Sequence, residues 1–321
     1  MPLQFDMPYE ELLIYGGSSP KPDDFDAFWD RSLEELAEVD PDISIEPSSF
    51  SAPHAECFDL IFTGTGGSRV YSKLLRPKGA GISERPAFIE FHGYGGSSQD
   101  WFNYLGWVGA GYTVAAMDCR GQGGMSEDRG CVSGTTRVGH IVRGIEDDPE
   151  NMLFRNVFLD TARLTQIVSA LPYVNSKRVS VGGGSQGGGL ALACAALVPD
   201  LIYKTASTFP FLSDFKRIWE MDKAVDAYDE IREYFRRRDP LHQHVDLFWE
   251  KLGYIDIQNL APRIKSKLLM VVGLMDTICP PSTQFAAYNK ISSEKELLVY
   301  KDYGHENMPQ RLDKVFEFID S

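Results

Sequence analysis

One short stretch of the chain, residues 178–198, changes from a strand-like to a helix-like pattern across a cluster of glycines. Its first residues alternate between valine and small or polar types, and its second half is rich in alanine and leucine, which predicts a buried helix. Gly183-x-Ser185-x-Gly187 stands at the junction. Glycines let neighbouring backbone pass closely, and a serine on such a turn takes a strained conformation that projects its hydroxyl from the sheet. The pattern is that of a nucleophile elbow.

An ordinary glycine-rich turn between a strand and a helix, with a serine present by chance, would show the same spacing. The rest of the chain has to distinguish this interpretation from a nucleophile elbow. The chain has 321 residues, of which 43% are hydrophobic and 24% charged, as is typical of a globular protein with a large core. The net charge of -14 argues against a nucleic-acid partner, because phosphate binding needs clustered cations. The basic run 236–238 is interpreted as a solvated helix end.

Targeting, membrane and redox signals are weak throughout the sequence. The first residues lack a basic segment followed by an apolar one, so no signal peptide is expected, and no apolar run is long enough to span a membrane. The cysteines are odd in number and widely scattered, which predicts neither a disulfide framework nor a metal site and fits a reduced, cytoplasmic setting. They are Cys57, Cys119, Cys131, Cys194 and Cys279.

Apolar segments typical of strands alternate with helical patterns from residue 87 onward. Strands are predicted before Ser185 and at 87–91, 112–117, 204–209, 267–273 and 296–300, and helices after Ser185 and at 100–108, 156–170 and 311–319. This alternation predicts an α/β fold with a mostly parallel, doubly wound sheet. We expect a single domain over residues 1–321.

Four segments of the chain lie outside this alternation of strands and helices. Residues 1–55 form an aromatic N-terminal arm in which an amphipathic helix opens at Asp23-Asp24, and a β-hairpin is predicted around the glycines at 64–67. Residues 120–155 form a polar, glycine-spotted loop whose length suggests that it covers the site or contacts another subunit. Residues 210–260 are charged, aromatic and helical in pattern, so we expect a cap over the strand ends that gates the pocket.

Three chemically distinctive residues follow predicted strands, in the order Ser185, Asp276, His305. Open α/β sheets place their sites at these strand ends, and the order is that of α/β-hydrolase triads. A serine hydroxyl needs a base to take its proton, and the unperturbed pKa of histidine near 6.5 suits it to this task. An aspartate then holds the imidazole tautomer and stabilises the imidazolium. Taken singly, Asp276 could be a helix cap and His305 a surface histidine.

The glycine-rich loop 92–96 follows an early strand, where a hydrolase of this kind supplies an oxyanion donor. We assign the two oxyanion donors to the backbone N–H groups of Tyr94 and Gln186. His92 is interpreted as a structural histidine that pins this loop. His242 and His244 are too few to suggest a metal without further ligands, so neither a metal nor a cofactor is expected.

Three short motifs occur in order along the chain, namely Arg120-Gly121-Gln122, Gly183-Gly184-Ser185-Gln186-Gly187 and His305-Glu306. Together they resemble the signatures of the acetyl xylan esterase / cephalosporin-C deacetylase family of carbohydrate esterases. The similarity covers essentially the whole chain, including the arm, the long loop and the helical insertion, with no departure at the motif positions. From the residues alone, Arg120 is expected to pin loops through several hydrogen bonds.

The resemblance implies an intracellular, metal-independent serine esterase that removes O-acetyl groups from short xylo-oligosaccharides and from cephalosporin C. Its partner would be a small acetylated substrate rather than nucleic acid or membrane. The resemblance also implies a doughnut-like hexamer whose active sites face an internal chamber, with the loop after Arg120 at the subunit contacts. Because fold does not fix substrate, a peptidase, a short-chain lipase or a thioesterase remains the alternative. A catalytically silent binding protein would lack a triad member, and none is missing.

Overall fold

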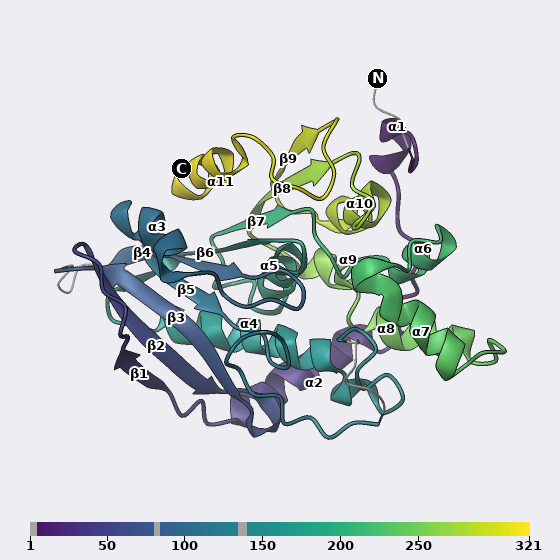
Figure 1. The fold of residues 1–321 in the computed structure, drawn as a ribbon, viewed down its shortest axis with the longest axis horizontal. Coiled ribbons are helices and arrows are strands. Elements are labelled where there is room, and N and C mark those ends of the chain that lie inside the picture. The colour runs from purple at the N-terminus through teal and green to yellow at the C-terminus, as the bar shows by residue number, and fades with distance from the viewer. Residues whose placement is uncertain (1–4, 80–83, 134–139) are drawn as a thin grey trace.

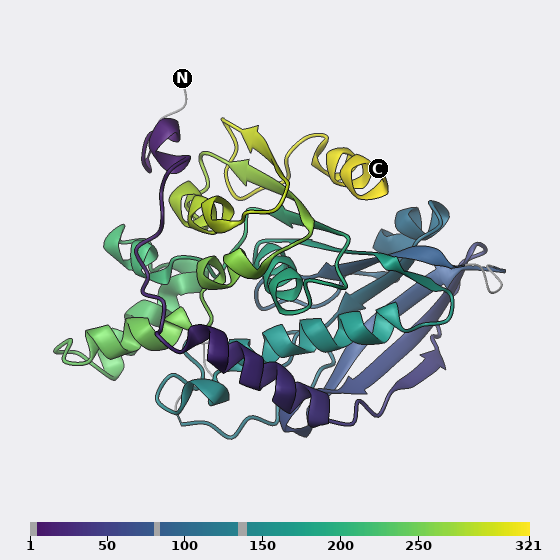
Figure 2. The same ribbon diagram turned by 180° about the vertical axis from the view of Figure 1, so that it is seen from behind.

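The computed structural model describes residues 5–79, 84–133 and 140–321. They form one twisted nine-stranded sheet with helices on both of its faces (Figures 1 and 2), in the strand order β1-β2-β3-β5-β4-β6-β7-β8-β9. Its antiparallel part comprises β1 (Ser44–Pro47), β2 (Ala55–Thr63) and β3 (Arg69–Pro77), with β3 also antiparallel to β5. Its parallel part comprises β4 (Arg85–Phe91), β5 (Thr113–Met117), β6 (Val174–Gly184), β7 (Lys204–Thr208), β8 (Lys267–Gly273) and β9 (Lys295–Tyr300).

The predicted α/β class and the mostly parallel sheet are confirmed. Six strands of the sheet run parallel, and the central ones are apolar because helices cover both of their faces. All parallel strands therefore end at one edge, the edge at which the sequence places Ser185 and Asp276. The glycines at 64–67 connect β2 and β3 as an antiparallel hairpin, as predicted.

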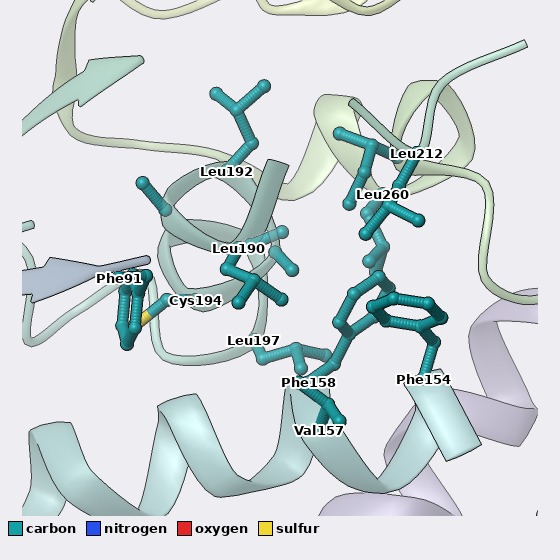
Figure 3. Packing of buried hydrophobic residues seen from close by; sticks show 14 of the residues in the cluster. Phe91, Phe154, Val157, Phe158, Leu190, Leu192, Cys194, Leu197, Leu212 and Leu260 are labelled. Carbon is teal, nitrogen blue, oxygen red and sulfur yellow. The ribbon is translucent and has the colours of Figure 1, made fainter. Parts of the chain in front are cut away.

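The larger core lies on one face of the sheet, under α2 (Phe25–Glu38), α4 (Leu153–Ser169), α5 (Gln186–Leu197) and α10 (Pro281–Lys290). Helix α5 is apolar all round and every residue in it is buried, as expected for a helix enclosed by other elements. Figure 3 shows Leu190 and Leu197 of this helix directed towards Phe158 of α4. This packing fixes the helix that begins immediately after Ser185.

The smaller core lies on the opposite face, under α3 (Leu105–Gly109) and α11 (Arg311–Asp320). Figures 1 and 2 show these two helices together on that side of the sheet. They meet where the rings of Trp107 and Phe316 approach to 5.3 Å between centroids. One short helix and the C-terminal helix thus cover the middle of a wide sheet.

The N-terminal arm contributes more structure than its sequence suggested. The expected helix forms as α2 after Asp24, and its Trp29 stacks on Phe158 of α4 at 5.9 Å. The arm also contains the short helix α1 (Tyr9–Leu12) and the edge strand β1, neither of which was anticipated. Both are too short to show a hydrophobic period, so local sequence could not reveal them.

The insertion at 210–260 is helical, as predicted, and comprises α6 (Phe215–Glu220), α7 (Asp229–Arg237), α8 (Val245–Gly253) and α9 (Ile257–Leu260). Asp214 ties it to the arm, because its carboxylate accepts hydrogen bonds from the backbone of Ser18 and Ser19 and from the Tyr15 hydroxyl. Lys251 of α8 donates to the carbonyl of Asp147 in the long loop at 2.7 Å. The insertion is therefore fastened to both the N-terminal arm and the long loop.

Some predicted boundaries were wrong. Helix α4 begins at Leu153 rather than Asn156, and the helix expected at 100–108 is a 3₁₀ turn, Trp101–Tyr104, followed by α3. Part of the long loop, 134–139, lies outside the described residues. Every helix within the described ranges is either too short or too polar to span a lipid bilayer. The single-domain assignment stays a prediction.

Candidate active site

The turn at Ser185 has the backbone expected of a nucleophile elbow. Ser185 has φ 57° and ψ −122°, a backbone conformation that residues other than glycine rarely adopt. Gly187 passes so close to β4 that a Cβ atom there would lie 1.9 Å from the carbonyl oxygen of Phe91, and one on Gly183 would lie 2.6 Å from the same atom. Both flanking glycines are thus required by backbone contact.

Neighbouring strands hold this strained turn. The Ser185 N–H donates to the carbonyl of Thr208 on β7 at 3.0 Å. The Ser185 carbonyl accepts from the N–H groups of Gly189 and Phe211, both at 3.0 Å. The backbone groups of the serine are satisfied on both sides, so its position is set by the sheet and by the first turn of α5.

Asp276 and His305 meet beside this edge of the sheet. His305 Nδ1 lies 2.8 Å from Asp276 Oδ2, and the Asp276 side chain is fully buried. Asp276 Oδ1 accepts from the N–H groups of Ile278 and Cys279 at 2.9 and 2.8 Å, which fixes the carboxylate. The loop bearing His305 packs closely on β8, because a Cβ on Gly273 would lie 2.4 Å from the Tyr303 carbonyl oxygen.

The Ser185 hydroxyl faces the loop that carries the aspartate. Burial and the Asp276 charge raise the pKa of the Cys279 thiol, whereas an interaction with the Ser185 side chain lowers it. Among the described residues, no hydrogen bond joins the Ser185 hydroxyl to His305. Ser185, Cys279 and Asp276 therefore lie together, with the His305 ring held by Asp276. The hydroxyl and imidazole are not paired in this state of the molecule.

The two predicted oxyanion donors come from the residue after Ser185 and from the loop after β4. Gln186 is the first residue of α5, where helix geometry leaves its N–H without an intrahelical acceptor. Tyr94 follows β4 in the loop after His92. Within the described ranges, no residue accepts a hydrogen bond from the backbone N–H of Tyr94 or of Gln186. Both amides are thus available to a developing oxyanion.

His92 pins the loop through both ring nitrogens. Its Nε2 accepts from the Cys119 N–H at 3.0 Å, and its Nδ1 lies 2.7 Å from the Gly93 carbonyl, to which it donates. Burial lowers the pKa of His92, which favours the neutral ring that this pattern requires. The geometry agrees with the structural role expected from the sequence.

Gln122 joins the oxyanion loop to the nucleophile turn. Its Nε2 donates to Gln186 Oε1 at 2.8 Å, its Oε1 accepts from Gln186 Nε2 at 3.0 Å, and the Gly95 N–H donates to the same oxygen at 3.0 Å. Arg120, two residues earlier, forms a buried bidentate pair with Asp160 of α4 at 2.7 and 2.6 Å, and donates to the Thr65 carbonyl. Arg120 therefore holds neighbouring segments together, as expected, and Asp160 is its acidic partner.

Glu230 is a site neighbour that sequence reasoning missed. This buried residue of α7 accepts a hydrogen bond from the Tyr94 hydroxyl and another from the Val142 N–H at 2.8 Å. Burial raises the pKa of Glu230 to about 7. The contact joins the insertion, the long loop and the oxyanion loop. Its only sequence signal was an acidic residue in an amphipathic helix, which also describes a solvated face.

No metal centre emerges from the described part of the chain. Groups of three or more His, Cys, Asp or Glu side chains placed to share an ion are absent from it. His242, weighed against a metal role in the sequence, stacks on Phe235 with ring centroids 4.6 Å apart. That histidine belongs to the aromatic packing of the insertion.

The sequence of this chain is similar to that of a known protein family. The model of the acetyl xylan esterase (AXE1) family matches residues 1–321. The chain belongs to the acetyl xylan esterase family. This is a family of carboxylic ester hydrolases, and the resemblance inferred from the three motifs is confirmed. Acetyl esterase Axe7A of Xylanibacter ruminicola is 26% identical over 87% of the chain, and the chain spans 62% of that relative's length.

Two solved members of the acetyl xylan esterase family are similar over nearly their whole length. Acetyl xylan esterase 1 from Thermoanaerobacterium sp. JW/SL YS485 is 54% identical, with a TM-score of 0.96 and 98% of each chain covered. The acetyl xylan esterase from Paenibacillus sp. R4 is 34% identical, with a TM-score of 0.92 and coverage of 98% of this chain and 99% of that one. The α/β-hydrolase GrgF from Penicillium sp. sh18, 18% identical, shares the fold alone.

Proposed function

We propose that this protein is a serine esterase that removes acetyl groups from acetylated xylo-oligosaccharides, with Ser185 as nucleophile. The observation that carries the proposal is Ser185 on its strained turn, beside an Asp276–His305 pair with a 2.8 Å hydrogen bond. A nucleophile, a base and an orienting carboxylate at one strand edge are what acyl transfer requires. The names of the similar acetyl esterases support the acetyl group and the xylan-derived alcohol.

In the first half-reaction, the Ser185 hydroxyl turns from the Cys279 side towards His305 Nε2. Hydrogen bonds of this kind are often unformed before substrate binds. The serine oxygen attacks the ester carbonyl as Nε2 takes its proton, while Asp276 stabilises the imidazolium. The N–H groups of Tyr94 and Gln186 hold the oxyanion. Cleavage of the carbon–oxygen bond releases the sugar, whose oxygen receives the proton from His305.

The second half-reaction restores the enzyme. His305 takes a proton from water, and the resulting hydroxide attacks the acetyl group on Ser185. The intermediate releases acetate, and the serine oxygen recovers its proton from the imidazolium. Every proton passes through one histidine, so a metal ion is not required in this scheme.

A panel of substrates tests the acetyl preference. We expect acetyl esters, including acetylated xylotriose and cephalosporin C, to be hydrolysed with much higher kcat/KM than octanoyl esters, thioesters or dipeptide amides. Efficient turnover of octanoyl esters would favour a lipase, and turnover of dipeptides a peptidase. Either result would replace the deacetylase proposal while leaving the triad in place.

Assembly and location rest on the family resemblance alone. We propose a cytoplasmic homo-hexamer with the loop after Arg120 at the subunit contacts. Sedimentation equilibrium of the purified protein tests the assembly, and a monomer at micromolar concentration would contradict it. Cell fractionation of the native host tests the location.

A further inference from the structure

A cavity of about 720 Å³ lies between α3 and α11, on the sheet face opposite α4 and α5. Strands β4, β6 and β7 contribute to its lining, which includes Phe88, Glu90 and Trp107. Ser185 and Gly93 also line it, so the cavity reaches the turn that carries the proposed nucleophile. Its volume is in the range of small-molecule sites. The mechanism proposed above assigns no role to the residues that line the rest of the cavity.

The cavity exists because the sheet presents very small residues there. Glu90 on β4 stands in register with Gly182 on β6, and Gly182 in turn with Ala206 on β7. Neighbours in register point to the same face of a sheet, so a carboxylate stands beside two positions with almost no side chain. A Cβ on Gly182 would lie 2.8 Å from the Phe88 ring, so this strand position has to stay small.

Two groups of opposite charge, Glu90 and Arg311, line this space and act on each other only through the field of their charges. Within the described residues, neither the Glu90 carboxylate nor the half-buried Arg311 guanidinium has a hydrogen bond or an ion pair. Burial raises the pKa of Glu90 to about 7, and the charge of Arg311 opposes that rise. Both residues are partly buried, and charged groups that are partly removed from water usually gain hydrogen bonds in exchange. Their orientation towards an open cavity therefore points to hydrogen bonds with a ligand.

Aromatic rings and amides complete the lining. Trp107 stacks on Phe88 with centroids 4.2 Å apart and touches Phe316 at 5.3 Å. Asn103 and Asn307 add side-chain amides to the rim. The lining thus combines apolar ring faces with donors, acceptors, the two carboxylates of Glu90 and Asp313 and the one guanidinium of Arg311. A ligand with net charge would meet a like charge at Glu90 or at Arg311, which favours a neutral, polyhydroxylated ligand.

We propose that the α3/α11 cavity binds the sugar chain of the ester substrate, a neutral pyranoside segment whose acetylated end reaches Ser185. The Glu90 carboxylate accepts from sugar hydroxyls, Arg311 donates to ring or hydroxyl oxygens, and Trp107 and Phe316 pack on the apolar C–H face. The inference rests on the proposed deacetylase function and extends it to a chain-binding subsite. Glu90 and Arg311 would set preference for oligosaccharide esters over small esters.

The variants Glu90→Gln and Arg311→Gln test the subsite while conserving much of each side chain's reach. Each should raise KM for acetylated xylotriose about tenfold, as expected for losing one charge-assisted hydrogen bond. Hydrolysis of p-nitrophenyl acetate, which is too short to fill the cavity, should change less than about twofold. Lys314→Gln, one turn along α11 on an exposed site, is the control and should leave both substrates unaffected. Equal changes for the two substrates, or none for xylotriose acetate, would overturn the inference.

Binding without turnover separates this inference from the proposed reaction. Titration calorimetry of Ser185→Ala with unacetylated xylotriose should show binding that weakens about tenfold when Glu90→Gln is added. Undiminished binding in the double variant would refute the subsite even if wild-type enzyme deacetylates xylan fragments. Conversely, if wild type fails to release acetate but Glu90→Gln still weakens xylotriose binding, the subsite stands and the proposed reaction falls.

Discussion

Gln122 and Gln186 exchange two hydrogen bonds between their side-chain amides, at 2.8 and 3.0 Å. Gln186 is buried and carries one proposed oxyanion donor on its backbone. The oxygen of Gln122 also accepts from Gly95, the residue after the second proposed donor, Tyr94. A single side chain thus fixes the spacing of the two N–H groups across which an oxyanion would sit.

Replacing Gln122 by leucine should lower kcat through loss of this spacing. Misplacing a catalytic group by about 1 Å can cost roughly 10²-fold. We expect kcat for p-nitrophenyl acetate to fall about 10- to 100-fold, with KM changed less than about threefold, because no substrate contact is removed. Gln243→Leu, at an exposed glutamine outside this network and outside the α3/α11 cavity, is the control. A variant with wild-type kcat would show that Gln122 does not position the donors.

Asp276→Asn tests the orienting role of the carboxylate. The amide keeps the shape but can stabilise the wrong tautomer of His305, and in serine proteases that change lowers kcat about 10⁴-fold. A similar loss is expected in steady-state assays at pH 8. Asp302→Asn, an exposed carboxylate near His305 in sequence, should retain activity. Retention of more than a tenth of wild-type kcat by Asp276→Asn would argue against the assigned role.

The buried Arg120–Asp160 pair predicts a stability effect rather than a chemical one. Arg120→Met leaves the Asp160 carboxylate buried without its cation and should lower the free energy of unfolding by about 3–5 kcal/mol. The double variant Arg120→Met with Asp160→Leu removes both charges and should recover part of that loss. Urea denaturation measures both values. Additive losses in the double variant would contradict the expected coupling.

The pH dependence of stability provides a test of Glu90. Burial raises its folded-state pKa to about 7, above the unfolded value, so the folded state binds more protons between those values and stability falls as pH rises. Glu90→Gln cannot ionise, so it should raise the melting temperature at pH 8 and change it little at pH 5. Differential scanning calorimetry at the two pH values checks this. Equal shifts at both would mean that Glu90 titrates normally.

Most of the proposed catalytic residues could be predicted from the sequence, because they lie at turns that directly follow strands. Close backbone contacts require glycine at 183 and 187 on either side of Ser185, and Asp276 and His305 each follow a recognisable strand. Parallel strands bring such positions to one edge whatever the packing details. The fold class and the family resemblance could therefore be predicted from these motifs.

The unforeseen features depend on distant partners. Nothing near Arg120 identifies Asp160 as its counterion, and nothing near Glu230 indicates that Tyr94 binds it, since both pairs form only when α4 and α7 dock. The juxtaposition of Glu90 with Gly182 likewise needs the register of β4 and β6. Local periodicity carries no information on such pairings.

Turnover of p-nitrophenyl acetate by Ser185→Ala tests the central claim most directly. The proposed covalent mechanism predicts that kcat falls about 10⁶-fold, with the folded structure retained by circular dichroism. A variant whose kcat stays within tenfold of wild type would show that Ser185 is not the nucleophile and would contradict the account.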